Sequence, residues 1–177
     1  LLRLDAAIFC LHAILTAMFV AIPVLLVTQT GIPEARQWVV YLPVLLLAFL
    51  AMLPFIIIAE KGHKMKEVLI AAIVLLGLVQ LGFIALPHSF WTVFIELLCF
   101  FTAFTLLEAT LPSLISKMAP QGSKGTAMGV YSTCQFLGVF VGGSVGGWLY
   151  GEHNVNGVFV FCAVLALIWL GLALTMR

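Results

Sequence analysis

The stretch from Lys124 to Trp148 most constrains the fold of this chain, because no charged side chain interrupts it before Glu152. At about 1.5 Å rise per residue, a helix of this length crosses a bilayer core of roughly 30 Å. Interior glycines would weaken such a helix in water by about 1 kcal/mol each relative to alanine. In lipid the backbone stays helical, and small residues four apart let a neighbouring helix approach closely. We therefore predict a membrane helix with these packing residues: Gly129, Gly138, Gly142, Gly143, Gly146 and Gly147.

The composition of the whole chain agrees with a membrane protein. Of 177 residues, 64% are hydrophobic and only 8% are charged, whereas a soluble domain carries about 25% charged residues. A soluble globular protein is thereby excluded, and the lipid bilayer becomes the first expected partner. The formal net charge of +1 gives no reason to expect nucleic-acid binding. Because the first residue is leucine, we expect the chain to be part of a longer one.

Apolar runs predict an all-α membrane protein of six transmembrane helices in one domain. The short connections between them make consecutive helices antiparallel neighbours. Two successive groups of three helices would then begin on opposite sides of the membrane, as in an inverted three-plus-three repeat. The expected spans are residues 5–28, 38–59, 68–86, 90–116, 126–150 and 155–176.

The distribution of basic residues predicts the orientation of these helices. Positively charged side chains gather in the cytoplasmic loops of membrane proteins. Only Arg36 lies at one set of helix ends, so we expect both termini in the cytoplasm. The basic residues at the other ends are Arg3, Lys61, Lys64, Lys66, Lys117, Lys124 and Arg177.

The loop between the second and third spans permits two interpretations. Its plain interpretation is this positive-inside signal, carried by Lys61, Lys64 and Lys66. Its sharper interpretation is a cytoplasmic gate, in which Glu60 at a helix end pairs with a basic residue on another helix.

Two ionisable side chains are predicted at one depth within the membrane. His12 in the first span and Glu108 in the fourth both fall about 7–8 Å to the cytoplasmic side of the midplane. Ionisable groups inside a bilayer are expensive and mark a pathway or a partner. A carboxylate and an imidazole at one depth can exchange a proton or hold a cation. The alternatives are a neutral structural glutamic acid and a hydrogen-bonded packing histidine.

Five further residues complete the candidate proton and substrate pathway. Thr16 shares a helical stripe with His12, and Thr105 lies one turn from Glu108. Glu96 lies about a third of a turn around the helix from Glu108, so the two carboxylates do not form an acid/base dyad. Tyr131 lies one turn before Gln135, and these two could bind a polar substrate or bond across helices.

The sequence lacks the motifs of several kinds of catalytic and cofactor site. The chain has no phosphate-binding glycine loop followed by Lys-Ser or Lys-Thr, and no His-Glu-x-x-His motif. Haem ligation by two histidines within the bundle is disfavoured, because His12 alone lies inside a span, whereas His63, His88 and His153 lie in loops. We expect no catalytic residues, no metal and no organic cofactor.

Several motifs carry a family resemblance that covers essentially the whole chain. Residues 111–117, 124–133, 135–138 and 142–148 resemble the C-terminal half of a major facilitator superfamily transporter, of the bacterial inner-membrane drug-efflux branch. Residues 59–66 look like a second copy of the family's cytoplasmic signature loop, with Glu60 in place of Asp. The segment 138–147 is similar to the glycine-rich antiporter motif.

The resemblance implies proton-coupled transport of a small amphipathic molecule. Protons would be the coupling ion, and an N-terminal six-helix half would be the partner that rocks against this half. The first and fourth helices would line the cavity. One alternative is a proton-driven importer of a sugar-like solute, which should show more polar side chains in the cavity. Another is a non-transporting six-helix assembly or signalling protein. An intramembrane enzyme is disfavoured, because no nucleophile, base and metal set is visible.

Overall fold

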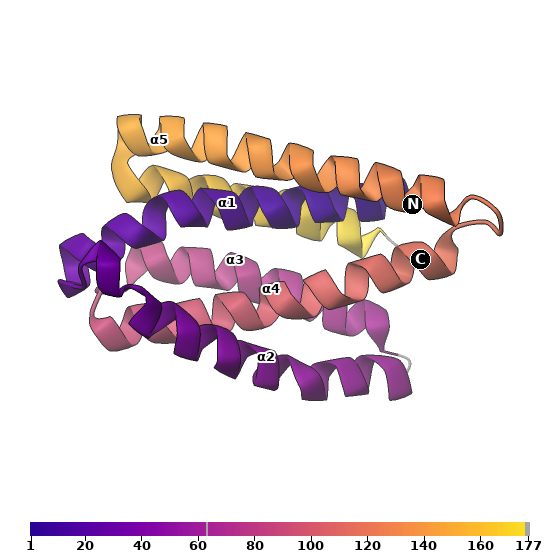
Figure 1. The fold of residues 1–177 in the computed structure, drawn as a ribbon, viewed down its shortest axis with the longest axis horizontal. Coiled ribbons are helices and arrows are strands. Elements are labelled where there is room, and N and C mark those ends of the chain that lie inside the picture. Colours follow the sequence, from indigo (N-terminus) through magenta and orange to yellow (C-terminus); the bar gives the residue numbers. More distant parts are fainter. Residues whose placement is uncertain (63, 176–177) are drawn as a thin grey trace.

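The computed structural model describes residues 1–62 and 64–175, and all regular structure in this part of the chain is helical. Within these described ranges, five helices are long and apolar enough to cross a membrane. His63, Met176 and Arg177, which include the end of the last expected span, lie outside the described residues. The helices are α1 (Leu2–Thr30), α2 (Trp38–Lys61), α3 (Met65–Ala85), α4 (Phe90–Met118) and α5 (Lys124–Leu174), with a short 3-10 helix η1 (Glu34–Arg36) before α2 (Figure 1).

The fifth helix differs from the expectation of two separate spans joined by a loop at 151–154. It is 51 residues long, or about 76 Å, which exceeds a bilayer core of roughly 30 Å. Asn154 breaks it with φ 58° and ψ −163°, a backbone conformation outside the helical region that residues other than glycine rarely adopt. Figure 1 shows the chain turning back at this end of the molecule. We call residues 124–153 the first arm of α5 and residues 155–174 the second arm.

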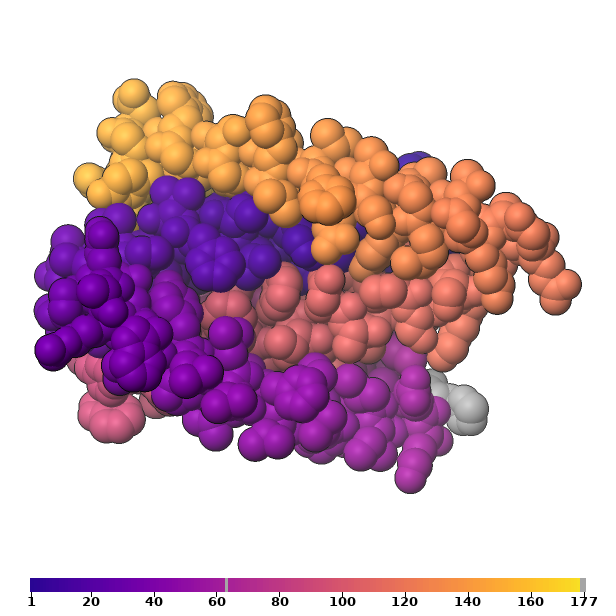
Figure 2. Space-filling model, viewed as in Figure 1, coloured from indigo at the N-terminus to yellow at the C-terminus, as the bar shows by residue number. Residues whose placement is uncertain are grey.

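The helix α1 lies at the centre of the bundle. It packs mainly against α5, while α2 packs against α4, and α3 packs against both α4 and α5. The central position explains why α1 is the most buried helix and α2 the least buried. Figure 2 shows one face of the molecule, on which α2 and the first arm of α5 form the two edges, with α1 and α4 between them. The exposed side chains of α2 are mostly large and hydrophobic, as expected for a helix that faces the lipid of a membrane.

The first arm of α5 approaches the backbone of α1 through one glycine face. A Cβ atom at Gly142 would collide with the carbonyl oxygen of Ala13 and the hydroxyl of Thr16. A Cβ atom at Gly146 would lie 3.0 Å from Ala17 Cα. The glycines of this face are Gly138, Gly142 and Gly146. Only residues without a side chain permit so close an approach, which fixes α1 and the first arm as one unit.

The other expected packing glycines face open space. A Cβ atom added at any of them would meet no atom within 4 Å outside the helix's own backbone. These residues are Gly129, Gly143 and Gly147. Both sets recur at helical spacing, so the spacing alone does not distinguish the face that contacts α1 from the open face.

The beginning of α1 and the end of the second arm of α5 lie at one end of the bundle (Figure 1). The turns between α2 and α3 and between α4 and α5 lie at this same end, and they carry most of the basic residues. Arg3 Nη1 donates a hydrogen bond of 2.5 Å to the carbonyl oxygen of Thr175, which joins the beginning of α1 to the end of the second arm. Arg36, in η1, lies at the opposite end.

Candidate functional site

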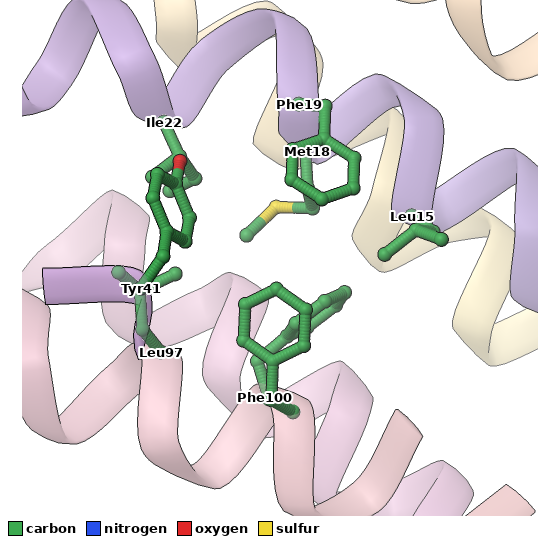
Figure 3. Close-up of a pocket in the computed structure, with 8 residues that line it drawn as sticks. Leu15, Met18, Phe19, Ile22, Tyr41, Leu97 and Phe100 are labelled. Carbon is green, nitrogen blue, oxygen red and sulfur yellow. The ribbon is translucent and has the colours of Figure 1, made fainter. Parts of the chain in front are cut away.

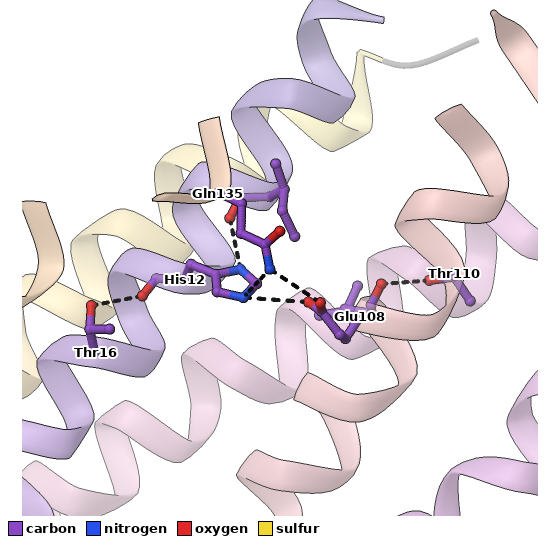
Figure 4. A network of polar contacts seen from close by, with 7 residues as sticks. His12, Thr16, Glu108, Thr110 and Gln135 are labelled. Carbon is purple, nitrogen blue, oxygen red and sulfur yellow. Dashed lines mark hydrogen bonds and ion pairs between the residues drawn. The ribbon is translucent and has the colours of Figure 1, made fainter. Parts of the chain in front are cut away.

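Three polar side chains meet where α1, α4 and the first arm of α5 converge (Figure 4). Gln135 Nε2 lies 2.9 Å from His12 Nε2, a residue 123 positions away in the chain. The same nitrogen donates a hydrogen bond of 3.5 Å to Glu108 Oε1. His12 Nε2 lies 3.7 Å from Glu108 Oε2. We call His12, Glu108 and Gln135 the polar cluster.

The ring of His12 is held in a defined orientation. Its Nδ1 lies 3.3 Å from the carbonyl oxygen of Ile8, which can only accept a hydrogen bond, so Nδ1 carries the proton of the neutral ring. Its Nε2 then offers a lone pair to the amide of Gln135. The Phe104 ring packs edge-on against the imidazole, with centroids 5.8 Å apart. The side chain of His12 is only 9% exposed, whereas that of Glu108 is 36% exposed.

The polar cluster has two hydrogen-bond arrangements that differ by one proton. With neutral His12, the amide nitrogen of Gln135 donates to both His12 and Glu108. A protonated His12 carries a proton on Nε2 and can donate it directly toward Glu108, so that Gln135 must present its carbonyl oxygen to the ring instead. Binding of a proton to His12 can therefore change the hydrogen bonds that connect α1, α4 and α5.

The two threonines expected in the pathway make hydrogen bonds to the backbone. Thr16 Oγ1 donates to His12 O at 2.8 Å and lies 3.1 Å from Val139 O, so it supports the contact between α1 and the first arm of α5. Thr105 Oγ1 donates to Phe101 O on its own helix at 2.7 Å. Neither hydroxyl contacts the carboxylate of Glu108 in the described part of the chain. Both threonines border the polar cluster without joining it.

Glu96 and Tyr131 make no hydrogen bond to the polar cluster among the described residues. Glu96 is only 6% exposed, and its carboxylate oxygens have no hydrogen-bond partner among the described residues. It faces Gly82 of α3, where a Cβ atom would lie 2.7 Å from Glu96 Oε1. Tyr131 is 3% exposed, and its hydroxyl also has no partner within the described residues. Both residues are more buried than the partly exposed Glu108.

The loop between α2 and α3 does not form the expected contact between helices. Glu60, Lys61, Lys64 and Lys66 are all exposed. Lys64 Nζ lies 4.0 Å from Glu67 Oε2, within the same loop and the first turn of α3. Across the described ranges, no ion pair joins Glu60 to a basic residue of another helix. This conformation thus lacks the gating contact proposed for Glu60.

An aromatic cluster lies next to the polar cluster and was not identified from the sequence. Phe104, which contacts His12, lies 6.4 Å from Phe101 between ring centroids. Phe101 lies 6.4 Å from Phe19 and 6.5 Å from Tyr41. Phe19, Tyr41 and Phe101 line a small apolar cavity between α1, α2 and α4, together with Phe100 (Figure 3). We call Phe19, Tyr41, Phe101 and Phe104 the aromatic cluster. In the sequence, Phe19 alone of the four lies on the same helical face as His12. The other three lie within uniformly apolar runs, where no pattern distinguishes them from lipid-facing residues.

A bundle of long apolar helices with ionisable groups inside it defines a multi-pass membrane protein. Residues 4–177 match the family described as the Major Facilitator Superfamily. The chain is 48% identical over 177 residues, all of this chain and 39% of the relative, to the "Inner membrane transport protein YajR" of Escherichia coli (strain K12). The chain belongs to the major facilitator superfamily, and the family predicted from its motifs is thereby confirmed.

More distant relatives include one protein that is named as a transporter and one that is named for multidrug resistance. An "Uncharacterized transporter" of Buchnera aphidicola subsp. Baizongia pistaciae is 31% identical over 170 residues, 96% of this chain and 43% of the relative. The "Multidrug resistance protein MdtH" of Aeromonas salmonicida is 26% identical over 146 residues, 82% of this chain and 36% of the relative. The chain thus spans about two fifths of the length of these relatives. It belongs to a family of inner-membrane transporters and not of enzymes.

Proposed function

We propose that this chain is the C-terminal six-helix half of a proton-coupled exporter of small amphipathic molecules. The two arms of α5 count as two crossings in this proposal, so that the bundle comprises two groups of three helices in an inverted repeat. The other half would be an N-terminal six-helix bundle that rocks against this one. Both termini would face the cytoplasm, because the basic residues gather at their end of the molecule.

The polar cluster is the observation that carries the proposal. His12, Glu108 and Gln135 come from three helices and form one hydrogen-bonded group inside a largely apolar bundle. Intramembrane groups of this kind are costly unless they have a role. Glu108 is the member that reaches the surface of this half, so a proton can enter and leave there. Binding of a proton would change which atom of Gln135 faces His12, and so link protonation to the positions of α1, α4 and α5.

The aromatic cluster supports an amphipathic substrate. Phe19, Tyr41, Phe101 and Phe104 extend from His12 between α1, α2 and α4. Aromatic faces bind apolar groups and attract organic cations by about 0.5–2 kcal/mol each. A sugar-like solute would instead need several hydrogen-bonding side chains beside the path. Few such side chains lie there among the described residues, and the relative MdtH is named for multidrug resistance.

The experiment uses the protein with its N-terminal half present, reconstituted in proteoliposomes under an imposed proton gradient. Flux of a lipophilic cationic dye is compared among the wild type, Glu108→Gln and the control Glu152→Gln. Glu152 is exposed at the turn of α5 and lies outside the polar cluster. We expect gradient-driven flux to be lost in Glu108→Gln and kept in Glu152→Gln. Equal flux in all three proteins would contradict the role of Glu108, and gradient-driven uptake of a sugar without dye flux would favour the importer.

A further inference from the structure

The hydroxyl of Tyr131 is buried without a hydrogen-bond partner among the described residues. Tyr131 lies in the first arm of α5 and is only 3% exposed. A buried polar group that makes no hydrogen bond is costly, and native proteins contain few of them. We therefore expect the hydroxyl to have a partner in another state of the protein.

Glu108 has an unpartnered atom of the same kind. Its side chain is 36% exposed, yet Oε2 is buried and accepts no hydrogen bond within the described ranges. The other oxygen, Oε1, accepts the hydrogen bond from Gln135. Since Nδ1 carries the proton of the neutral His12 ring, Nε2 at 3.7 Å from Oε2 has no proton to donate. The carboxyl group thus has a donor at one oxygen and none at the other.

Helix geometry places Tyr131 close to this carboxyl group. Tyr131 precedes Gln135 by four residues, so the two side chains lie on one face of the helix, about 6 Å apart along its axis. Gln135 reaches Glu108 from this face. The charge of Glu108 also acts on the Tyr131 hydroxyl. An unpartnered donor and an unpartnered acceptor therefore lie in one buried region between α4 and the first arm.

We propose that Tyr131 is a positioning residue for Glu108, and that its hydroxyl donates a hydrogen bond to Oε2 when Glu108 is charged. The carboxylate would then accept one hydrogen bond from Gln135 at Oε1 and one from Tyr131 at Oε2. Hydrogen bonds to a charged group are roughly twice as strong as those between neutral groups. The bond would form when Glu108 releases its proton and break when the proton returns. Release of the proton would thereby draw α4 toward the first arm of α5.

Asp5 of α1 is the competing acceptor for the same hydroxyl. It is 6% exposed, and its Oδ1 makes no hydrogen bond to any described residue. A hydroxyl donates only one hydrogen bond, so it cannot bond both acids at once. Glu108 is the favoured acceptor, because its charge acts on the hydroxyl more strongly than that of Asp5. The other titratable groups of this region are His12 on α1 and Cys134 on the first arm.

The test follows the protonation of Glu108 in the protein with its N-terminal half present. Infrared difference spectra over a pH series give the midpoint of the carboxyl band that Glu108→Gln removes. Tyr131→Phe removes only the hydroxyl, and loss of a donor to the charged form should raise this midpoint by about one pH unit. Tyr150→Phe, the same change near the other end of the first arm, should leave the midpoint unchanged. The shift should persist when Tyr131→Phe is made in an Asp5→Asn background.

The proposal rests on the proposed function in one respect, namely that Glu108 exchanges a proton. If no carboxyl band depends on Glu108, both fail together. An unchanged midpoint in Tyr131→Phe, with the band still lost in Glu108→Gln, would overturn the role of Tyr131 alone. A shift that disappears in the Asp5→Asn background would make Asp5 the acceptor and would also overturn it. Dye flux in Glu108→Gln tests transport separately.

Thermal unfolding of the detergent-purified protein provides a second measurement. Below the midpoint Glu108 is neutral, and Tyr131→Phe should unfold at the wild-type temperature or above it, because the variant lacks a buried hydroxyl without a partner. Above the midpoint the variant should unfold at a lower temperature than the wild type, because the charged Glu108 has lost a donor. An equal loss on both sides of the midpoint would give the hydroxyl a purely structural role and contradict the proposal.

Discussion

Two glutamates on α4 illustrate how the neighbouring helices decide what an intramembrane acid can do. Glu96 and Glu108 are twelve residues apart on the same helix. Glu108 is half-exposed and faces His12 and Gln135. Glu96 is buried against Gly82, without a hydrogen-bond partner among the described residues. The side chains are identical, and their surroundings are opposite.

The difference indicates separate roles for the two acids. A carboxyl group with a titratable neighbour and access to the surface can exchange protons as the protein changes conformation. A carboxyl group enclosed by apolar helices without a partner is held in its neutral state, because burial of an isolated charge is too costly. We therefore propose proton exchange for Glu108 and helix packing between α3 and α4 for Glu96.

The largest expected effect comes from placing a lysine at each position. Glu96→Lys would bury an unpaired cation and should destabilise the fold by about 3 kcal/mol. Glu108→Lys should cost less, because its side chain can reach the surface of this half. The measurement is the midpoint of thermal unfolding of the detergent-purified protein. A larger loss for Glu108→Lys would contradict the assigned environments.

The contact between Gly82 and the carboxylate of Glu96 offers a second test of the buried site. Gly82→Ala would place a Cβ atom 2.7 Å from Glu96 Oε1 and should destabilise the protein by about 1–3 kcal/mol. Gly77→Ala is the matched control on α3, because its Cβ atom would lie 3.7 Å from Ala166 Cβ, an ordinary contact.

A double variant shows whether this clash accounts for the loss. Glu96→Ala should relieve most of the cost of Gly82→Ala, so that the two changes couple in a double-mutant cycle. Strictly additive losses in thermal stability would mean that the absence of a side chain at Gly82 is not needed to accommodate Glu96.

The half-exposed site is tested by removing its hydrogen-bond donor. Gln135→Leu removes the amide that joins His12 and Glu108, while the bundle should remain folded. A hydrogen bond to a charged group contributes about 1.5 kcal/mol, so the pH of half-maximal dye flux should move by about one unit. Thr133→Val is the control, because Thr133 is exposed on the same arm and bonds only to its own helix. An unchanged pH profile in Gln135→Leu would separate Gln135 from proton binding.

The smallest expected effect concerns the aromatic cluster, which extends from the site of Glu108 and not from that of Glu96. Phe101→Leu should weaken the apparent affinity for a lipophilic cation by about fivefold, since a cation–π contact contributes about 1 kcal/mol. Its maximal flux should be kept. Phe136→Leu, at a residue 70% exposed on the first arm of α5, should change neither quantity. Equal changes in both variants would mean that the aromatic cluster has no special role.

The sequence predicted much of this arrangement, because depth along a helix can be counted. Residue counting placed His12 and Glu108 at one level, and the structure places them 3.7 Å apart. The turn of the helix also separated Glu96 from Glu108. Counting along one helix does not tell which residues of other helices lie beside it. The contact of Gln135 with both groups therefore needed the structure.

Lateral packing explains the other differences as well. The glycines of α5 recur on two faces at the same spacing, yet Gly142 lies against α1 and Gly143 faces open space. The turn of α5 was expected as a loop, but a single residue, Asn154, makes the break within a helical backbone. Both outcomes depend on which helix lies beside α5, and local sequence patterns do not carry that information.

The most direct test of the account is whether Glu108 changes its protonation state while Glu96 does not. Infrared difference spectra between acidic and alkaline pH report the C=O stretch of protonated carboxyl groups. They are recorded on the protein with both halves present, for the wild type, Glu108→Gln and Glu96→Gln. We expect a pH-dependent carboxyl band in the wild type and in Glu96→Gln, and its loss in Glu108→Gln. A band that persists in Glu108→Gln and disappears in Glu96→Gln would contradict the assignment and move proton binding to the buried acid.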